Sequence, residues 1–244
     1  MVLGLAGAGV QVIATAAREE EEIQQVADEA RARWGDDRVL PLIADVTRQE
    51  DCEEVVAAAL SRWQRLDILV SNAGRGMKYV SERFLTEPTR FWETDPKTWK
   101  MIIDTNVNGP FLMARTAVPP MIQAGWGRIV NISMNRETMR RRGFSPYGPS
   151  KAALESETAI WAQDLEGTGV TVNSLLPGGA TLTGMIPDDL PAEIRSNLLD
   201  PEIIVAPLLW LVSSEADGLT GRRLIANRWD KNDPGSAMED AGWG

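Results

Sequence analysis

Residues 145–155 read Ser-Pro-Tyr-Gly-Pro-Ser-Lys-Ala-Ala-Leu-Glu and place Tyr147 and Lys151 four residues apart at the opening of a helix. Side chains with this spacing lie on one helix face, so the phenol and the ammonium should be neighbours. A free tyrosine has a pKa of about 10, and a nearby cation favours its phenolate form. The spacing therefore predicts a tyrosine of lowered pKa that transfers protons. A packed tyrosine beside a solvated lysine gives the same pattern, so the pair needs support from the rest of the chain.

The composition indicates a folded globular protein whose partner is a small molecule. The chain has 244 residues, of which 43% are hydrophobic, and this is enough to bury a core. The formal net charge of -10 leaves no excess of basic residues to neutralise phosphates. We therefore expect neither a nucleic acid nor an anionic membrane surface as a partner.

Cysteine and histidine usage narrows the possible sites and the compartment. Cys52 is the single cysteine and the chain has no histidine, which excludes an intramolecular disulfide and the usual Cys/His zinc sites. We expect no bound metal and a reducing, cytoplasmic setting. Residues 1–17 are apolar, but no Lys or Arg precedes the apolar run and glycines interrupt it. We therefore expect neither a signal peptide nor a membrane span.

Short apolar runs alternate with segments of helical periodicity along the chain. The runs predict strands at residues 11–15, 38–43, 67–70, 127–132, 170–175 and 223–226. The periodic segments predict helices at residues 19–34, 47–63, 97–117 and 203–213 and a helix that begins at Tyr147, with Thr47 as the cap of the second of these. This alternation predicts an α/β fold with a parallel sheet that is covered on both sides.

Polar and glycine residues follow four of the predicted strands. They are Asp45, Asn72, Ser133, and Pro177 with Gly178. Parallel sheets bind ligands outside the carboxyl ends of their strands. These residues should therefore lie along one crevice, although Asp45 and Asn72 are also the residue types that cap turns.

The order and spacing of these motifs resemble the short-chain dehydrogenase/reductase family of the classical type, from about Gly9 to Trp229. The resemblance rests on Asp-Val at 45–46, Ser-Asn-Ala-Gly at 71–74, Asn106 in a long helix, Asn-Ile-Ser at 131–133, the tyrosine stretch, and Pro-Gly-Gly at 177–179. Each motif alone is weak, and their joint order is specific. The resemblance implies a single Rossmann-like, doubly wound domain over residues 1–244, with residues 230–244 as a loose tail.

The resemblance also implies a reaction and a set of site residues. The reaction is hydride transfer between a nicotinamide cofactor and a small carbonyl or alcohol substrate. In the family the tyrosine moves the proton, the lysine holds the nicotinamide ribose and lowers the tyrosine pKa, and the asparagine of the long helix positions a water. These roles fall on Tyr147, Lys151 and Asn106, although Asn106 also suits a purely structural bond to a backbone carbonyl. The residues implied to line the cofactor are Asp45, Val46, Asn72, Ala73, Gly74, Pro177 and Gly178.

The front of the chain departs from the family pattern, which begins with a strand and a glycine-rich turn. Gly4, Gly7 and Gly9 are not preceded by a strand or followed by a helix, as that fingerprint requires. The better alignment takes residues 3–15 as the end of the first helix followed by the second strand. The fold is then expected to lack the first, central strand, which leaves its two neighbours with unpaired edges. Either the start lies upstream, which we favour, or the chain is a truncated or degenerate relative.

The sequence identifies the catalytic serine less clearly than it identifies Tyr147 and Lys151. The family commonly reads Asn-Ile-Ser-Ser with the second serine catalytic, whereas Met134 stands at that position here. Ser133 is the nearest hydroxyl and is taken as its replacement, with Asn135 as another possible donor.

Arg18 follows the strand at residues 11–15 and suits the 2'-phosphate of NADP. NAD stays open, because Arg18 also suits a solvated helix start and Glu19 suits a ribose.

For the substrate-binding part of the site, the sequence indicates two segments but no individual residues. Residues 75–96 form a long connection with several arginines and aromatic residues, and residues 181–199 are a candidate lid. The resemblance implies a homodimer or homotetramer through the helices that begin near Lys97 and Lys151. Two other readings remain, a non-catalytic binding or scaffold relative and an inactive fragment that does not fold.

Overall fold

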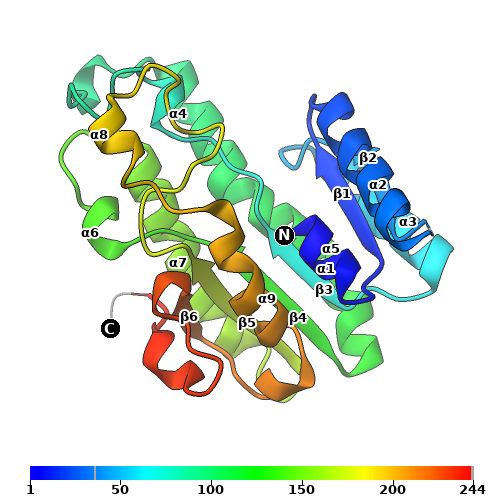
Figure 1. The fold of residues 1–244 in the computed structure, drawn as a ribbon. Coiled ribbons are helices and arrows are strands. Elements are labelled where there is room, and N and C mark those ends of the chain that lie inside the picture. The colour runs from blue at the N-terminus through cyan, green and yellow to red at the C-terminus, as the bar shows by residue number, and fades with distance from the viewer. Residues whose placement is uncertain (36, 243–244) are drawn as a thin grey trace.

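The computed structural model describes residues 1–35 and 37–242, and these form one α/β domain (Figure 1). The strands are β1 (Val12–Ala16), β2 (Val39–Ile43), β3 (Ile68–Ser71), β4 (Gly127–Ile132), β5 (Val170–Leu176), β6 (Arg222–Ile225) and β7 (Met238–Asp240). The helices are α1 (Val2–Gly7), α2 (Glu20–Trp34), α3 (Gln49–Trp63), α4 (Pro96–Ile103), α5 (Gly109–Ala124), α6 (Arg136–Met139), α7 (Tyr147–Asp164), α8 (Ala192–Arg195) and α9 (Val205–Leu211). Every strand predicted from periodicity is present, and each predicted helical segment is helical, although the segments predicted at 97–117 and 203–213 are each divided into shorter helical pieces.

The sheet is divided into two parts. Strands β1 and β2 form a parallel pair, and β3, β4, β5, β6 and β7 form a second sheet in that order, parallel except for β7. Within the described residues, β1 pairs only with β2 and β3 pairs only with β4. A cavity of about 770 Å³ lies between β1 and β3 and is lined by residues of both strands. The prediction that the central strand is lacking is thus confirmed for the described residues.

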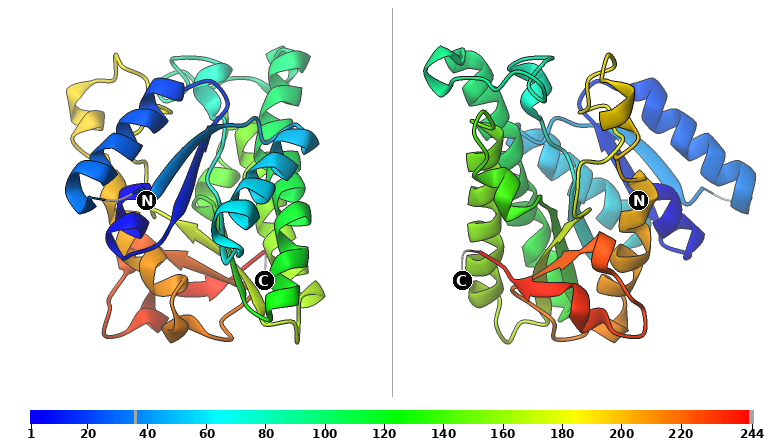
Figure 2. Two further views of the ribbon diagram at one scale, coloured as in Figure 1. Left: turned by 90° about the vertical axis from the view of Figure 1, so that its right-hand side faces the viewer. Right: turned by 60° about the vertical axis from the view of Figure 1, so that its left-hand side comes forward.

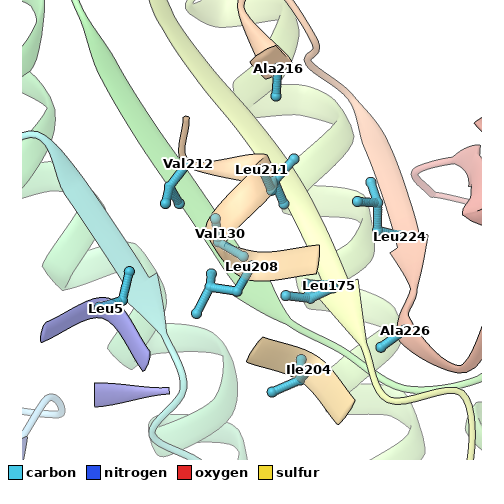
Figure 3. Packing of buried hydrophobic residues seen from close by; sticks show 10 residues of the cluster. All are labelled: Leu5, Val130, Leu175, Ile204, Leu208, Leu211, Val212, Ala216, Leu224 and Ala226. Atoms are coloured by element: carbon cyan, nitrogen blue, oxygen red, sulfur yellow. The ribbon is translucent and has the colours of Figure 1, made fainter. Parts of the chain in front are cut away.

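Helices cover both faces of the larger sheet because its inner strands are apolar on both faces (Figure 2). On one face, Val130 and Leu175 pack with residues of α9 and with Leu5 of α1 (Figure 3). On the other face, Ile129 and Val172 pack against α5 and α7. Adjacent strand residues therefore serve opposite faces, as the two-residue repeat of a strand requires.

The long helical segment after β3 is divided and extends further than predicted. Asp95 caps α4 by accepting a hydrogen bond from the backbone N–H of Thr98 at 3.2 Å. A π-helical turn, η3 (Asp104–Asn108), then connects α4 to α5. Helix α5 continues through Pro119 and Pro120, whereas the prediction stopped at residue 117. Burial of Met121 against the sheet keeps the segment helical despite the two missing N–H groups.

The end of the chain is packed, which contradicts the prediction of a loose tail over residues 230–244. Strand β7 pairs antiparallel with β6, and Ala237 before it is fully buried. Glu239 of β7 forms an ion pair with Arg223 at 3.1 Å and with Arg228 at 2.9 Å. Described residues 230–242 are therefore part of the domain, because an edge strand and ion pairs attach them. Residues 243 and 244 lie outside the described residues.

The helices give no indication of a membrane span. Among the described residues, none combines the length and the apolar composition that crossing a bilayer requires.

Candidate active site at the carboxyl edge of the sheet

Helix α7 places Lys151 beside the carboxyl end of β4. The lysine side chain is only 4% exposed, and its Nζ donates a hydrogen bond to the carbonyl oxygen of Ile132 at 2.7 Å. Burial lowers the pKa of Lys151 to about 8, and the charge of Glu155 one turn further along opposes this shift. The hydrogen bond to Ile132 thus fixes the direction of the Lys151 side chain. With a pKa of about 8, its amino group is largely protonated at neutral pH.

Tyr147 begins the same helix and packs with apolar side chains. It is half-buried and lies against a cluster formed by Met77, Phe84 and Phe144, next to Met134. Burial raises the pKa of Tyr147 to about 12. The prediction that Lys151 lowers this pKa is therefore wrong for this structure, because desolvation dominates. Tyr147 is a protonated phenol at neutral pH.

Asn106 connects the Tyr147 turn to the loop after β3. It lies in the π-helical turn and is fully buried. Its Oδ1 accepts a hydrogen bond from the backbone N–H of Arg75 at 2.7 Å, and its Nδ2 donates to the carbonyl oxygen of Arg75 and to Ser150 Oγ, both at 2.9 Å. Ser150 Oγ in turn donates to the carbonyl oxygen of Tyr147 at 2.7 Å. The structure therefore gives Asn106 the structural role considered above, with all these contacts made inside the protein.

Ser133 follows β4 directly and lies next to the residue that holds Lys151. Its side chain is 4% exposed, and its Oγ has no hydrogen-bond partner among the described residues. A buried hydroxyl without a partner is unusual and fits a group that meets a ligand. The alternative donor, Asn135, is already engaged, because its Nδ2 donates to the carbonyl oxygen of Gly178 at 3.0 Å.

Asn72, Ala73 and Gly74 form the loop that leaves β3. Asn72 and Ala73 are exposed and line the large cavity. A Cβ atom at Gly74 would lie 3.4 Å from Asn106 Oδ1 and 3.4 Å from Met185 Cε. This space is therefore narrow, and glycine keeps it open between the π-helical turn and the candidate lid.

Asp45 holds the turn that follows β2. Its Oδ1 accepts hydrogen bonds from the backbone N–H and the hydroxyl of Thr47 at 2.9 and 2.8 Å. Burial by itself would raise the pKa of Asp45, but the Thr47 hydrogen bonds and the charges of Arg75 and Arg48 lower it overall. Thr47 therefore serves the Asp45 turn, and the prediction that it caps the next helix is wrong, since the N-cap of α3 is Arg48. Asp45 is a turn carboxylate within the electrostatic range of Arg75.

The remaining predicted cofactor residues, Val46, Arg18, Pro177 and Gly178, follow the carboxyl ends of their strands. Val46 would be 2.7 Å from a Cβ at Gly109, so it packs against the start of α5. Arg18 is exposed after β1, and its backbone N–H bonds to the carboxylate of Glu19 at 3.2 Å. Pro177 and Gly178 follow β5, where Gly178 has a φ of 92°. A left-handed residue there favours glycine.

Residues 181–199 form a flap that is closed at its base. Thr181 bridges Leu199, and the N–H of Leu182 donates to the carbonyl oxygen of Leu199 at 3.0 Å. Met185 of this flap lies next to Gly74, and Asp188 pairs with Lys78 of the loop after β3 at 3.4 Å. The candidate lid thus contacts the same loop that Asn106 holds.

Two residues that organise the site, Ser150 and Arg75, were not predicted from the sequence. Ser150 connects Asn106 to the Tyr147 turn through two hydrogen bonds. Its position in the sequence, directly before Lys151, could have indicated this role. Arg75 binds Asn106 through its backbone, and its Nε donates to Thr105 Oγ1 at 3.2 Å. Its guanidinium lies 5.0 Å from the centroid of the Tyr79 ring. No sequence pattern could have identified Arg75, because it bonds to Asn106 through its backbone and such a contact does not depend on residue type.

The site fits the nicotinamide and ribose half of a dinucleotide. The unpartnered hydroxyl of Ser133 and the buried Lys151 ammonium lie at the carboxyl end of β4, and Gly74 follows the neighbouring strand β3. The pyrophosphate half lacks its usual cradle in the part of the chain that the structure describes. There the space between β1 and β3 is a cavity rather than a strand followed by a helix N-terminus.

Comparisons with known proteins identify the family of the chain. Residues 1–193 match the family model described as short chain dehydrogenase. The chain is 31% identical over 232 residues to the short chain dehydrogenase mpl6 of Monascus purpureus, which covers 93% of this chain and 75% of that protein. It is 31% identical over 201 residues to D-beta-hydroxybutyrate dehydrogenase of Rhizobium meliloti (strain 1021), which covers 82% of this chain and 73% of that protein.

A solved structure shows the same fold. The 3-ketoacyl-(acyl-carrier-protein) reductase of Brucella melitensis, complexed with NADH, superposes with a TM-score of 0.77 at 26% identity. The match covers 90% of this chain and 87% of that one.

Proposed function

The chain belongs to the short chain dehydrogenase family, and from this premise we propose that it is an NAD(P)-dependent oxidoreductase acting on a carbonyl or alcohol group of a small molecule. The observation that carries the proposal is the hydrogen-bonded set at the carboxyl edge. Asn106 and Ser150 hold the Tyr147 turn, and the carbonyl of Ile132 holds Lys151. The unpartnered Ser133 hydroxyl lies beside them.

The roles follow from the chemistry of each side chain. The nicotinamide, when bound, supplies or accepts the hydride. Ser133 Oγ donates a hydrogen bond to the substrate oxygen, and Tyr147 gives that oxygen a proton in reduction or removes it in oxidation. Because burial raises the pKa of Tyr147 to about 12, the free site holds the phenol in its protonated form at neutral pH. That state suits the reduction of a carbonyl.

Lys151 and Asn106 support this proton transfer. The Lys151 ammonium is held by the carbonyl oxygen of Ile132 at the edge where a nicotinamide ribose would lie, and its other N–H groups would donate hydrogen bonds to the ribose hydroxyls. Asn106 fixes the helix turn that carries the tyrosine. Asn72, Ala73, Gly74, Pro177 and Gly178 border the same edge and would contact the cofactor.

Replacement of Tyr147 tests the proposal directly. Tyr147→Phe removes only the hydroxyl, and turnover with a panel of ketones and aldehydes should fall by about 10²–10⁴-fold, the range of general acid catalysis. The chain has two tyrosines, so Tyr79→Phe, at an exposed position, is the matched control. Equal turnover of the two variants would reject Tyr147 as the proton donor. If the wild-type protein binds NADPH but turns over no substrate, the result would favour a second candidate function, a non-catalytic binding protein. Met134 at the position of the usual serine supports this second candidate.

We infer NADP as the cofactor, with NAD as the second candidate. Arg18 is exposed just after β1, where its guanidinium can pair with a 2'-phosphate. The carboxylate of Glu19 lies close by and would instead favour the ribose hydroxyls of NAD. Arg18→Ser should weaken binding of NADPH and leave binding of NADH unchanged in a fluorescence titration. Equal loss for both cofactors would remove Arg18 from the cofactor site.

Assembly into a homodimer or homotetramer is a further part of this proposal. Phe111 and Ile122 of α5 and Ile160 of α7 are exposed apolar side chains on the two long helices. A self-association surface would cover them. Analytical ultracentrifugation tests this, and a monomer at all concentrations would reject it.

A further inference from the structure

A polar cavity of about 410 Å³ is lined by residues of α6, β6 and β7 and of the turns beside them. Of the described residues that line it, only Gly178 and Ile225 lack a polar side chain. Its charged lining consists of four arginines and two glutamates, namely Arg136, Arg140, Arg223, Arg228, Glu137 and Glu239. We call this cavity the arginine pocket. It concentrates positive charge in a chain whose formal net charge is -10.

Three of the arginines surround one carboxylate, that of Glu239. Its Oε2 accepts a hydrogen bond from Arg223 Nη1 at 3.1 Å, and its Oε1 accepts one from Arg228 Nη1 at 2.9 Å. Arg136 Nη1 lies 3.6 Å from Glu239 Oε2, which is too long for a hydrogen bond. Burial by itself would raise the pKa of Glu239, but the charge of Arg223, the hydrogen bond from Arg228 and the charge of Arg136 lower it overall. The surroundings of Glu239 therefore stabilise negative charge.

The carboxylates present do not neutralise the arginines. Arg223 has a second ion-pair partner, Glu155 at 3.5 Å, which does not line the pocket. With Glu155 included, four guanidinium groups stand against three carboxylates. The side chain of Arg228 is 56% exposed, and its bond to Glu239 is the one side-chain hydrogen bond it makes within the described residues. A guanidinium has five N–H donors, so Arg228 keeps donors for a ligand.

The chemistry of the lining selects an anion. A guanidinium presents parallel N–H groups that match two oxygens of a carboxylate or a phosphate. A metal cation would be repelled by the same groups, and an apolar group would leave them without partners. A volume of about 410 Å³ is in the range of small-molecule sites. The ligand is therefore a small molecule that carries a carboxylate or phosphate group.

The arginine pocket adjoins the candidate active site through the turn after β4. Arg223 Nη2 donates a hydrogen bond to the carbonyl oxygen of Met134 at 2.9 Å, and Met134 directly follows Ser133. Asn135 lines the pocket and donates to the carbonyl oxygen of Gly178 at 3.0 Å. Two residues of chain span at most about 7 Å, so the Cα atoms of Ser133 and Asn135 lie within that distance of each other. One small molecule can therefore place an anionic group in the pocket and a carbonyl group near Ser133.

We propose that the arginine pocket binds the carboxylate or phosphate group of a small molecule, and that this molecule is the carbonyl or alcohol substrate. The first part rests on the pocket alone, whereas the second rests on the proposed function. Arg228 donates hydrogen bonds to the anionic oxygens, and the reacting oxygen lies at Ser133. The substrate class is then oxo acids or keto phosphates, together with the corresponding alcohols.

Reduction of matched anionic and neutral ketones tests the proposal. Acetoacetate and levulinate are each compared with their methyl esters, and dihydroxyacetone phosphate is compared with dihydroxyacetone, in NADPH-dependent turnover. In at least one pair the anionic member should have a kcat/KM at least about tenfold higher than its neutral partner, the worth of one charge-assisted hydrogen bond. The pair that shows it distinguishes a carboxylate from a phosphate ligand. Reduction of neutral ketones without any preference for their anionic partners would overturn the proposal.

A charge-matched pair of variants assigns the preference to the pocket. Arg228→Met should lower the anionic-to-neutral ratio of kcat/KM by about tenfold. Arg142→Met is the control, because Arg142 is also exposed and does not line the pocket, and it should leave the ratio unchanged. A general loss of stability would lower turnover of both members of a pair and leave their ratio intact. An equal fall of the ratio in both variants would show an effect of net surface charge and would overturn the proposal.

Binding without turnover separates the pocket from the proposed function. Inorganic phosphate and acetate are titrated into the wild type, Arg228→Met and Arg142→Met by calorimetry at constant ionic strength, with no cofactor present. Saturable binding that only Arg228→Met weakens, by about tenfold, supports the pocket even if no ketone is reduced, and the lack of turnover then counts against the proposed function. If neither anion binds to the wild type, the pocket is refuted, and turnover of neutral ketones would leave the proposed function standing.

Discussion

Replacing Asn106 by alanine removes a hydrogen-bonded connection that holds the loop after β3 against the Tyr147 turn. The side chain is fully buried and makes three hydrogen bonds, two to the backbone of Arg75 and one to Ser150 Oγ. Each bond contributes about 1 kcal/mol to the free energy of unfolding, because burial leaves no water to replace the lost partner. We therefore expect Asn106→Ala to lower the free energy of unfolding by about 3 kcal/mol.

The expected loss is large enough to be measured as a shift in Tm. For a domain of this size, 1 kcal/mol corresponds to about 2–4 °C, so Tm should fall by about 6–12 °C in differential scanning calorimetry. Turnover should fall as well, because Ser150 loses one partner while it still bonds to the carbonyl of Tyr147. Turnover is measured well below the new Tm, so that the loss reflects the position of the tyrosine and not unfolding.

Asn108 is the matched control for this experiment. It lies in the same π-helical turn, is exposed, and makes a single side-chain bond to Asp104 Oδ1 at 2.9 Å. Asn108→Ala should shift Tm by no more than about 1–2 °C. If Asn106→Ala and Asn108→Ala show the same small shift and the same turnover, Asn106 does not hold the site together and the reasoning is refuted.

Three further predictions concern the packing and charge of the domain. Gly148→Ala would place a Cβ 2.2 Å from the carbonyl oxygen of Met139 in α6, and it should lower the free energy of unfolding by about 1–3 kcal/mol in chemical denaturation. Gly184→Ala is the control, because its Cβ would meet open space and the free energy of unfolding should not change. Equal effects of the two substitutions would contradict the close approach at Gly148. Burial raises the pKa of Glu157 from 4.5 to about 7, so its carboxyl destabilises the fold as pH rises through that window. Glu157→Gln should therefore be more stable than the wild type by roughly 1–2 kcal/mol at pH 8, allowing for partial exposure, and no more stable at pH 4; a gain at both values would argue against titration. Arg223→Met leaves Glu155 buried without its ion-pair partner at 3.5 Å and should lower the free energy of unfolding by about 3–5 kcal/mol in urea, and an unchanged midpoint would show that the pair contributes nothing.

The sequence predicted the elements and the parallel architecture because those depend on local periodicity. Apolar runs such as residues 127–132 and 170–175 are buried on both faces, and their identity as inner strands follows from composition alone. Strand β7 was missed because it has only three residues and depends on pairing with β6 and on the ion pairs of Glu239. Such a segment has no pattern of its own before the sheet exists.

Sequence spacing also predicted which side chains gather at the site but not how they interact. Tyr147 and Lys151 share a helix, and their neighbourhood follows from the four-residue spacing. Their pKa values do not follow from it, because burial sets both of them, and it raises that of the tyrosine to about 12. The partners of Asn106 are backbone groups and a serine from distant segments, which no residue pattern encodes.

By itself, the amino-acid sequence determined the succession of strands and helices, the family to which their motifs belong, and the lack of a segment between two of the strands. Only the tertiary structure decided that this lack leaves two sheet edges facing a common cavity, that burial raises the pKa of the tyrosine, and that the end of the chain is an edge strand. The physical reason is the same in each case. Periodicity and spacing are local properties, whereas desolvation, strand pairing and cavity formation depend on which distant segments come into contact.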